Sequence, residues 1–505
     1  MRKILYFIPL ILLLSCAVSK APKEEFRGVW IATVANIDWP KNPEDDVEKK
    51  KKDFIAILDF YKKLNFNAAI VQVRTSGDAF YQTDLAPWSK YLSGKEGEAP
   101  KGFDHPLKWM IEETHKHGME FHAWLNPYRA TINLDTTGLA KTHDFYQHPE
   151  WMVKYGQKYY YNPGLPEVRN NFNKIIDELI TNYEVDAIHF DDYFYPYKVE
   201  GEVFEDASTF SQYGLPNQSL EDWRRSNVDS LVKMVHKTIK TTKPWVQFGI
   251  SPFGVWKNRS TDPKGSDTQA GQTTYEDLYA DPLLWVQKGW LDYLAPQVYW
   301  SMDFPVASHK KITSWWNNAT PNTNLYIGNG AYKIKNNSDK AWDKSNEIPK
   351  QLKFSRNLEH VNGNIFFSAK SLIGKHEKVN QKLELKFYRF PAKNPGPLNK
   401  VKRNIPSPYI ESFQIQKENI GLCLSHSDSI PRFINLYKTQ GKSRQLLAKE
   451  YFAENKGQHC FWTELAPKHV KKNLAITIMD VYGNESDMQT LIQNNTNENQ
   501  LKHPK

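Results

Sequence analysis

The stretch Ala187-Ile188-His189-Phe190-Asp191-Asp192 (residues 187–192) joins a short apolar strand to two consecutive carboxylates. Side chains alternate in direction along a strand. The large apolar Ile188 and Phe190 suit a layer of covering helices, which leaves His189 and Asp191 on the opposite face. A strand that buries apolar groups outward and carries polar groups at its carboxyl end is typical of a parallel barrel.

Other apolar runs of similar length alternate with longer amphipathic segments. With residues 186–191, the expected strands are residues 26–34, 68–73, 120–126, 246–251, 292–299, 324–329 and 364–369. The clearest expected helices are residues 44–65, 162–183 and 219–241. This alternation predicts an α/β fold, a (β/α)8 TIM barrel, over residues 26–390. A doubly wound open sheet is the main alternative, but Gly328-Asn329-Gly330 lacks the further glycine of a dinucleotide-binding motif.

The pattern changes after residue 390. Residues 391–407 are rich in Pro and Lys and are expected to be a linker. Short strands without helices follow, at residues 410–416, 420–425, 431–438, 445–452, 458–464 and 473–481. They predict a small all-β sandwich over residues 408–490, with a disordered tail at 491–505. Cys423 and Cys460 lie on two of these strands, and whether they pair is left open.

The first residues have the features of an export signal. Arg2 and Lys3 precede an apolar stretch that is too short to span a bilayer. It ends in Leu13-Leu14-Ser15-Cys16, which resembles a bacterial lipobox, in which cleavage precedes the Cys and the Cys carries the lipid. We therefore expect a signal peptide at 1–15, lipidation of Cys16 and a tether at 16–25. An ordinary signal peptide is the alternative.

Composition and charge restrict the possible partners. Aromatic residues make up 13% of the chain, with 16 Trp and 26 Tyr. Such rings stack on sugar faces, although a large barrel core also uses them. Loss of Arg2 and Lys3 with the signal lowers the formal net charge from +9 to +7. This charge favours anionic envelope partners such as acidic glycans, whereas nucleic acid is not expected of an exported protein.

Strand facing brings polar side chains together at one mouth of the barrel. The inward set is Gln72, Arg74, His122, Asn126, His189, Asp191, Gln247, Ser251, Gln297 and Tyr299. Purely structural barrels fill these layers with Val, Ile and Leu. We therefore predict catalytic roles for Asp191 and Asp192. Substrate-binding roles are predicted for Trp30, Asn36, Asp38, Arg74, Asp78, Tyr81, His122, Trp124, Asn126, Arg129, Tyr193, Tyr195, Ser251, Gln297, Tyr299 and Trp300.

These roles have structural alternatives. Paired Asp residues after a strand often cap a loop. Because adjacent residues point oppositely, facing favours Asp191 as the acting carboxylate, with Asp192 as its orienter or partner. His189 suits a hydrogen-bonded core group better than a general base. Arg74 either holds a substrate carboxylate or pairs with a neighbouring Asp.

Other chemistries have less support. The sequence around Ser251 departs from a nucleophile elbow by one residue. There is no HExxH motif, no clustered Cys/His spacing for zinc, and no Walker-type loop. We expect neither a metal nor a cofactor.

Seven motifs resemble the glycosyl hydrolase-like family 10 barrel. They are FRGVWIATVANIDWP (26–40), QVRTSGDAFY with APWS (72–81, 86–89), FHAWLNPYR (121–129), YYYNPGLPEVR (159–169), HFDDYFYP (189–196), SPFGVW (251–256) and APQVYW (295–300). The resemblance spans about residues 26–390. It implies an exported enzyme, often a lipoprotein, with a fibronectin-III-like domain after the barrel. It also implies site roles for Asp191, Asp192, Tyr193 and Tyr195.

The predicted function is hydrolysis of O-glycosyl bonds in a polysaccharide of the cell envelope. Some members of the family act on peptidoglycan strands stripped of stem peptides, so the resemblance implies that substrate class. The expected location is the outer membrane, facing the periplasm, with attachment through the lipid. Three alternatives stay open: a non-catalytic glycan-binding lipoprotein, a glycosidase for another polysaccharide, and a scaffold whose sandwich docks a protein.

A glycosidase needs one carboxyl group to protonate the leaving oxygen and a second as nucleophile or base. Asp191 or Asp192 fills one role. Asp303, Asp78 and Asp38 are candidates for the other besides the partner Asp, because the strand at 324–329 carries no acid. The bond cleaved, the stereochemistry and the oligomeric state are left open.

Overall fold

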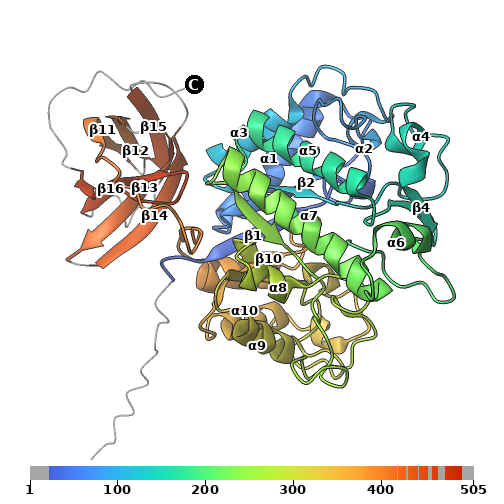
Figure 1. Ribbon diagram of the computed structural model, residues 1–505. Coiled ribbons are helices and arrows are strands. Elements are labelled where there is room, and N and C mark those ends of the chain that lie inside the picture. The colour runs from blue at the N-terminus through green and yellow to red at the C-terminus, as the bar shows by residue number, and fades with distance from the viewer. Residues whose placement is uncertain are drawn as a thin grey trace, which may run out of the picture.

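The computed structural model describes residues 22–417, 419–427, 430–441, 443–452, 458–464 and 473–491. Within these ranges a helix-covered barrel lies beside a smaller β-domain, drawn in orange to red in Figure 1. The predicted signal peptide at 1–15, the lipidation site Cys16 and nearly all of the tail at 491–505 lie outside the described residues, so these predictions remain untested.

In the described residues eight parallel strands close into a barrel. They are β1 (Phe26–Ile31), β2 (Ala68–Arg74), β3 (Glu120–Leu125), β6 (Ala187–Phe190), β7 (Gln247–Ile250), β8 (Tyr293–Leu294), β9 (Asn324–Asn329) and β10 (Val361–Phe366). Their order around the barrel is β1-β10-β9-β8-β7-β6-β3-β2. The predicted (β/α)8 barrel is confirmed. The strand expected at 292–299 shortens to β8, since Pro296 has no backbone N–H to continue the ladder.

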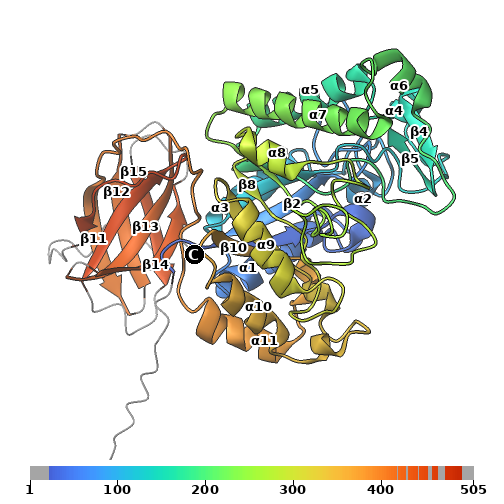
Figure 2. The same cartoon turned by 60° about the horizontal axis from the view of Figure 1, so that its bottom comes forward.

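Helices cover the outside of the barrel. The longer ones are α1 (Val47–Lys63), α3 (Pro106–Lys116), α5 (Pro166–Asn182), α7 (Leu220–Thr242), α9 (His309–Ala319) and α10 (Glu347–Ser355). The shorter ones are α2 (Lys90–Ser93), α4 (Asp144–Gln147), α6 (Ala207–Tyr213), α8 (Pro282–Gln287) and α11 (Glu377–Lys382). Figure 2 shows α5 and α7 side by side over one flank of the barrel and α9 to α11 over another. The helix expected from residue 162 begins at Pro166, because Asn162 accepts a hydrogen bond from Gly164 N in a preceding turn.

Apolar side chains pack on both sides of the barrel wall. Ile188 and Phe190 belong to the large core between strands and helices, where the Phe190 ring lies 5.4 Å from that of Phe172 on α5. Ala187 belongs instead to the small core inside the barrel. The predicted facing of β6 is therefore confirmed, and it leaves the interior side of this strand for polar groups.

A hairpin that the sequence pattern did not predict follows β3. It comprises β4 (Met152–Tyr155) and β5 (Lys158–Tyr161), each too short to show a clear alternation. An isolated bridge between Arg129 and Tyr160 ties it to the loop after β3. The hairpin therefore holds the backbone of Arg129 at the carboxyl end of the barrel.

The C-terminal domain is the predicted all-β unit. In its described part, β11 (Tyr409–Gln416), β12 (Asn419–Ser425) and β15 (Gln458–Glu464) form one antiparallel sheet. The second contains β14 (Ser443–Tyr451), β13 (Pro431–Gln440), β16 (Leu474–Asp480) and β17 (Gln489–Thr490). This division into three and four strands is that of a fibronectin-III-like sandwich. Cys423 and Cys460 face each other across β12 and β15 and form a disulfide.

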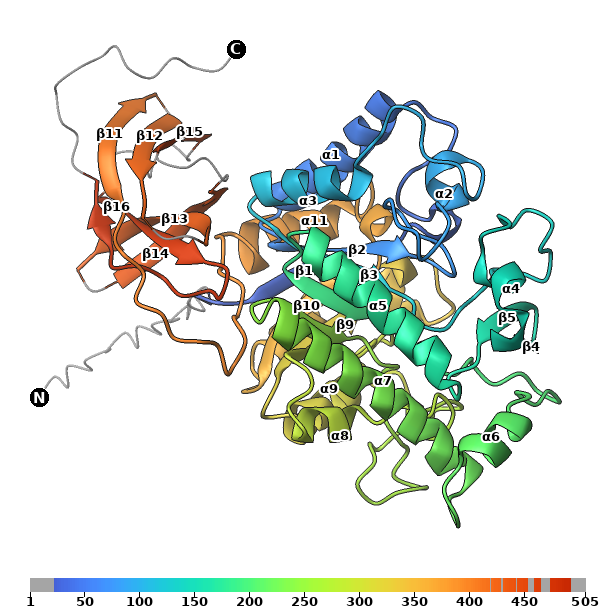
Figure 3. The ribbon, with the colours of Figure 1, turned by 45° about the horizontal axis from the view of Figure 1, so that its top comes forward.

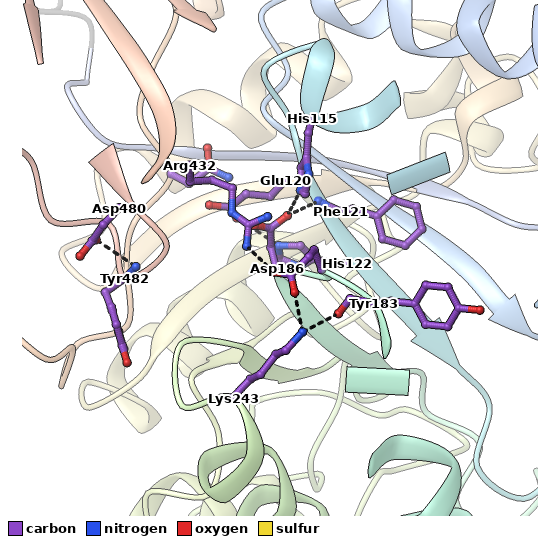
Figure 4. Close-up of polar contacts among 12 residues, drawn as sticks. His115, Glu120, Phe121, His122, Tyr183, Asp186, Lys243, Arg432, Asp480 and Tyr482 are labelled. Carbon is purple, nitrogen blue, oxygen red and sulfur yellow. Dashed lines mark hydrogen bonds and ion pairs between the residues drawn. The ribbon is translucent and has the colours of Figure 1, made fainter. Parts of the chain in front are cut away.

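The sandwich packs on the amino-terminal end of the barrel. Figure 4 shows Arg432 of β13 reaching Asp186, which directly precedes β6, with an Nε–Oδ1 distance of 3.6 Å. His115 Nε2 lies 2.7 Å from the same carboxylate, and the His115 ring stacks on Tyr451. In Figure 3 the arrow of β2 points away from the sandwich. The carboxyl ends of the strands therefore lie at the far end of the barrel from the sandwich.

None of the helices in the described ranges combines the length and the apolar content of a membrane span.

Candidate active site

A cavity of about 670 Å³ opens at the carboxyl ends of the barrel strands. Its lining residues come from the ends of, or the loops after, all eight strands: Trp30, Ala32, Val34, Ile37, Gln72, Trp124, Arg129, Asp191, Asp192, Tyr193, Tyr197, Ser251, Phe253, Gln272, Gln297, Tyr299, Trp300, Tyr332, Lys333 and Phe367. Active sites of such barrels form at this end. Of these lining residues, only Asp191 and Asp192 carry a carboxyl group.

Asp191 is held by a ring of N–H donors. Trp124 Nε1 donates to Oδ2 at 3.0 Å, Asn126 Nδ2 lies 3.1 Å from both oxygens, and Tyr193 N lies 3.4 Å from Oδ1. Asn126 is itself oriented, because its Oδ1 accepts from Arg129 N at 2.8 Å. Burial raises the pKa of Asp191, while the Arg129 charge and these donors oppose that rise. The donors favour the ionised carboxylate.

Asp192 has fewer partners and a higher pKa. Burial, and next the negative charge of Asp191, raise the pKa of Asp192 to about 7. The Tyr197 hydroxyl donates to Oδ2, and this bond and the Gln297 amide partly offset the rise. Two buried like charges side by side are unfavourable. When the pair holds one proton, Asp192 therefore carries it, which suits a general acid.

A chain of hydrogen bonds crosses the barrel interior below the pair. Trp30 Nε1 donates to His189 Nε2 at 3.2 Å, so the neutral His189 carries its proton on Nδ1. That nitrogen lies 2.9 Å from Tyr293 Oη, which lies 2.8 Å from His122 Nδ1. Burial holds the pKa of His189 well below its usual value. His189 is thus a hydrogen-bonded core group that orients Trp30, in line with the prediction.

The rest of the cavity wall is mainly aromatic. Trp30, Tyr299 and Phe367 pack together, with ring centroids 5.9–6.5 Å apart. Trp300 packs edge-on to Phe253 at 5.6 Å. Flat rings around a carboxylate pair suit a bound sugar, whose C–H faces stack on aromatic surfaces.

The structure separates the predicted substrate-binding residues into three groups. Those that line the cavity are Trp30, Trp124, Arg129, Tyr193, Ser251, Gln297, Tyr299 and Trp300. Asn126 lies behind the lining and contacts Asp191. The remainder lie outside the cavity: Asn36, Asp38, Arg74, Asp78, Tyr81, His122 and Tyr195. Ser251 Oγ lies 3.0 Å from His189 Nε2, so this cavity residue also joins the interior chain.

The prediction that Arg74 faces the cavity is wrong. The pairing of β2 with β3 shifts register between Gln72 and Arg74, and such a bulge breaks the alternation of side chains. Gln72 stays in the cavity wall, whereas the guanidinium of Arg74 lies 5.9 Å from the rings of Tyr161 and Phe172, outside it. His122 does face inward, but one layer below the cavity, against Tyr293 and Glu120.

None of the three loop acids predicted as the opposing carboxylate lines the cavity. Asp38 accepts hydrogen bonds from Ala32 N and the Ser368 hydroxyl, both at 2.8 Å. Asp78 caps the turn at Thr75 and accepts from its backbone N at 2.9 Å. Asp303 is exposed and does not line the cavity.

The predicted ring and amide residues outside the cavity are bound elsewhere. Asn36 donates to the carbonyl oxygens of Pro40 and Tyr91. Tyr81 packs edge-on to Tyr183, and Tyr195 packs against Phe204 and Tyr279. These contacts stabilise loops around the site.

Several cavity residues were missed from the sequence as site residues. Tyr197 lies five residues after Asp192, in a loop whose course no periodicity indicates. Tyr332, Lys333 and Phe367 follow β9 and β10, where no carboxylate marks the strand end as part of a site. Among the residues that the structure describes, no three His, Cys, Asp or Glu side chains gather as a metal site requires.

A closed parallel barrel with a buried carboxylate pair among aromatic walls at its carboxyl end defines a barrel glycoside hydrolase. The model of the family described as Glycosyl hydrolase-like 10 matches residues 25–344, and the chain belongs to this family. The predicted family resemblance and the enzyme class are therefore confirmed.

Two curated relatives and one solved structure illustrate the similarity. Glycosyl hydrolase YngK of Bacillus subtilis (strain 168) is 47% identical over 372 residues, which cover 73% of this chain and 72% of YngK. Glycosyl hydrolase DigH of Escherichia coli (strain K12) is 37% identical over 374 residues, covering 70% and 84%. The PgaB (BpsB) glycoside hydrolase domain from Bordetella bronchiseptica aligns with a TM-score of 0.47 and 11% identity, over 72% of this chain and 99% of that one.

Proposed function

We propose that this glycoside hydrolase cleaves peptidoglycan glycan strands from which the stem peptides have been removed. The observation that carries the substrate class is a pair of cations in the cavity wall, Arg129 and Lys333, beside aromatic stacking surfaces. Removal of a stem peptide from muramic acid leaves a free lactyl carboxylate. A stripped strand therefore presents both sugar faces and regularly spaced anions.

Lys333 is the better placed of the two cations to bind such an anion. Both Nε and Nη2 of Arg129 donate to Thr75 O, at 2.9 and 2.6 Å. Within the described chain, by contrast, no carboxylate forms an ion pair with Lys333, and burial lowers its pKa. A substrate carboxylate would stabilise this ammonium, which the protein leaves without a direct counter-ion.

Product analysis by mass spectrometry tests the activity. Stripped peptidoglycan, intact peptidoglycan and chitin are incubated with the protein and with Asp191→Asn and Asp192→Asn. We expect short glycans from the stripped strands, and a loss of at least ~100-fold in rate for either variant. Equal cleavage of intact and stripped peptidoglycan would contradict the substrate, and unchanged activity in both folded variants would contradict the site.

The role of Lys333 is tested by Lys333→Met. We expect KM for stripped strands to rise about tenfold, as a charge-assisted hydrogen bond contributes about 1.5 kcal/mol. Lys340→Met, at an exposed position nearby, is the matched control and should change nothing. An unchanged KM for Lys333→Met would show that this ammonium does not bind the lactyl group.

We also propose that the chain is held through lipidated Cys16 on the outer membrane, facing the periplasm. The lipobox-like segment supports this location, and the Cys423–Cys460 disulfide suits an oxidising compartment. Cys16→Ser should lose fatty-acid labelling and move from the membrane fraction to the soluble one. Persistent labelling of that variant would refute the anchor.

A further inference from the structure

The wall that faces the carboxylate pair has no acid. In the closed strand order, β10 lies four strands from β6 in either direction, so it stands directly across the barrel. The cavity residue that follows β10 is Phe367, and those that follow β9 are Tyr332 and Lys333. Of the described acids, only Asp191 and Asp192 reach the cavity, and both follow a single strand.

This arrangement fits poorly with the two usual glycosidase mechanisms. In both of them, two carboxyl groups flank the scissile bond, about 5 Å apart for retention and about 6.5–9.5 Å for inversion. One must reach the anomeric carbon from the side opposite the leaving group. Consecutive residues at one strand end approach the sugar from the same wall, and the facing wall supplies rings and an ammonium.

We propose that the missing nucleophile is the 2-acetamido group of the substrate, so that the enzyme retains anomeric configuration through an oxazolinium intermediate. This inference rests on the proposed function, because every sugar of a peptidoglycan strand carries an N-acetyl group. Substrate assistance of this kind is a known exception to the two-carboxylate rule.

The first step forms one bond and breaks one. The acetamido carbonyl oxygen bonds to C1 while the C1–O bond to the leaving sugar breaks. Asp192 transfers its proton to the leaving oxygen. In the second step a water oxygen bonds to C1, its proton returns to Asp192, and the bond from C1 to the acetamido oxygen breaks. Two inversions at C1 give net retention.

Asp191 has the surroundings that its role in this mechanism requires. Trp124, Asn126 and the Tyr193 amide supply three N–H groups to a carboxylate with about four acceptor sites. One acceptor position of Asp191 is therefore left to accept a hydrogen bond from the acetamido N–H and to hold the acetamido group against C1. The negative charge of Asp191 also stabilises the positive oxazolinium, in a site where Asp191 itself is 3% exposed.

Asp192 has the complementary surroundings. Its contacts with Tyr197 and Gln297 hold the carboxyl at the cavity surface, and the adjacent charge of Asp191 favours its protonated form. Consecutive positions on one strand end thus suit a sugar that brings its own nucleophile, since acid and orienting carboxylate then act from the same side.

The test compares stripped strands with the same strands after chemical de-N-acetylation, and follows the anomeric configuration of fresh products by proton NMR. We expect retention, a loss of about 100-fold or more on the de-N-acetylated strands, and competitive inhibition by a thiazoline-fused N-acetylglucosamine. Asp191→Asn should weaken inhibition by the thiazoline, with an unchanged circular-dichroism spectrum as the folding control.

Inverted products, or equal rates on both preparations, would overturn the substrate-assisted mechanism while leaving the proposed function intact. A glycosyl ester trapped on Asp191 would overturn it in the same way. Cleavage confined to polysaccharides without acetamido groups would overturn the mechanism and the proposed function together.

Discussion

Asp191 and Asp192 are adjacent in the chain, yet their surroundings give them different protonation states. Asp191 meets three N–H donors, from Trp124, Asn126 and Tyr193. Asp192 meets the Tyr197 hydroxyl and the charge of its neighbour. The alternation of side chains along the strand predicted that Asp191 is the residue aimed into the barrel. The structure brings both carboxyl groups to the cavity, because β6 ends at Phe190 and the chain no longer alternates beyond it.

The pH dependence of kcat/KM follows from the pKa of Asp192. The acid must be protonated, so activity should fall as pH rises through about 7. Tyr197→Phe removes a hydrogen bond that lowers this pKa, and should move the fall about one unit higher. Tyr332→Phe, the same change elsewhere in the cavity, should leave the profile in place. A profile unmoved by Tyr197→Phe would contradict the assignment of Asp192 as the acid.

The same group should make stability depend on pH. The pKa of Asp192 is about 7 in the folded chain and about 3.9 in an unfolded one. The stability that the protonated carboxyl contributes is therefore complete below about pH 4 and lost as pH rises to about 7. Asp192→Asn should raise the melting temperature by about 3 °C at pH 8 and have little effect at pH 4.

Calorimetry at the two pH values measures this difference. Asp78→Ala is the control, because it removes the carboxylate that accepts from Thr75 N and Ser76 N and should lower the melting temperature instead. A melting temperature that is lowered by Asp192→Asn at pH 8 would contradict the predicted cost of ionising Asp192.

Single strands decide which side chains reach the cavity. Because of the bulge in β2, Gln72 lines the cavity and Arg74 does not. Strand β7 contributes a residue without a side chain. Gly249 leaves room inside the barrel for the ring of Tyr293, and the Tyr293 hydroxyl is hydrogen-bonded to His122 and His189. A Cβ on Gly249 would overlap that ring.

Gly249→Ala should therefore destabilise the barrel by about 1–3 kcal/mol, because an extra methyl group overpacks a filled interior. Urea unfolding measures the change. Gly138→Ala is the matched control: the position is exposed, and an added Cβ meets nothing within 4 Å. Equal unfolding midpoints for the two variants would show that Tyr293 gives way without cost.

At the scale of the whole molecule, the sandwich and the active site occupy opposite ends of the barrel. The contact between the domains is charged as well as apolar. Asp186 interacts with His115 and Arg432, and Lys449 of β14 is buried beside the Phe433 ring at 4.1 Å. Burial raises the pKa of Asp186, but His115, through its hydrogen bond, and the Arg432 guanidinium together hold that pKa below its usual range. The sandwich therefore covers buried charges of the barrel.

Arg432→Gln should destabilise the chain by about 2 kcal/mol, because Asp186 then remains buried with one cation fewer. Calorimetry gives the loss, and limited proteolysis between the domains should become faster. Arg444→Gln on the outer part of the sandwich is the control, since Glu485 keeps its ion pair with Lys393 at 2.6 Å. Unchanged proteolysis in Arg432→Gln would show that this pair does not hold the domains together.

The sequence by itself determined the barrel, the all-β domain and the position of Asp191 and Asp192 at the carboxyl end of a barrel strand. Periodicity, turn residues and strand-end carboxylates are local features of the sequence, so they can be recognised without knowing how the elements pack. The sequence did not distinguish the residues that line the cavity from those that stabilise loops. Asp38, Asp78 and Tyr81 have the right chemistry, but they contact backbone groups or other rings. Nor did it find Tyr197 or Lys333.

Only the tertiary structure decided which carboxylate holds the proton and what stands opposite the pair. Both depend on groups that are distant in sequence. Trp124 and Asn126 come from β3 and the loop after it, while Phe367 follows β10 across the barrel. A pKa depends on burial and on nearby charges, and the lack of an acid on the facing wall of the cavity is a property of the closed ring of strands. Neither property can be inferred from a single stretch of the sequence.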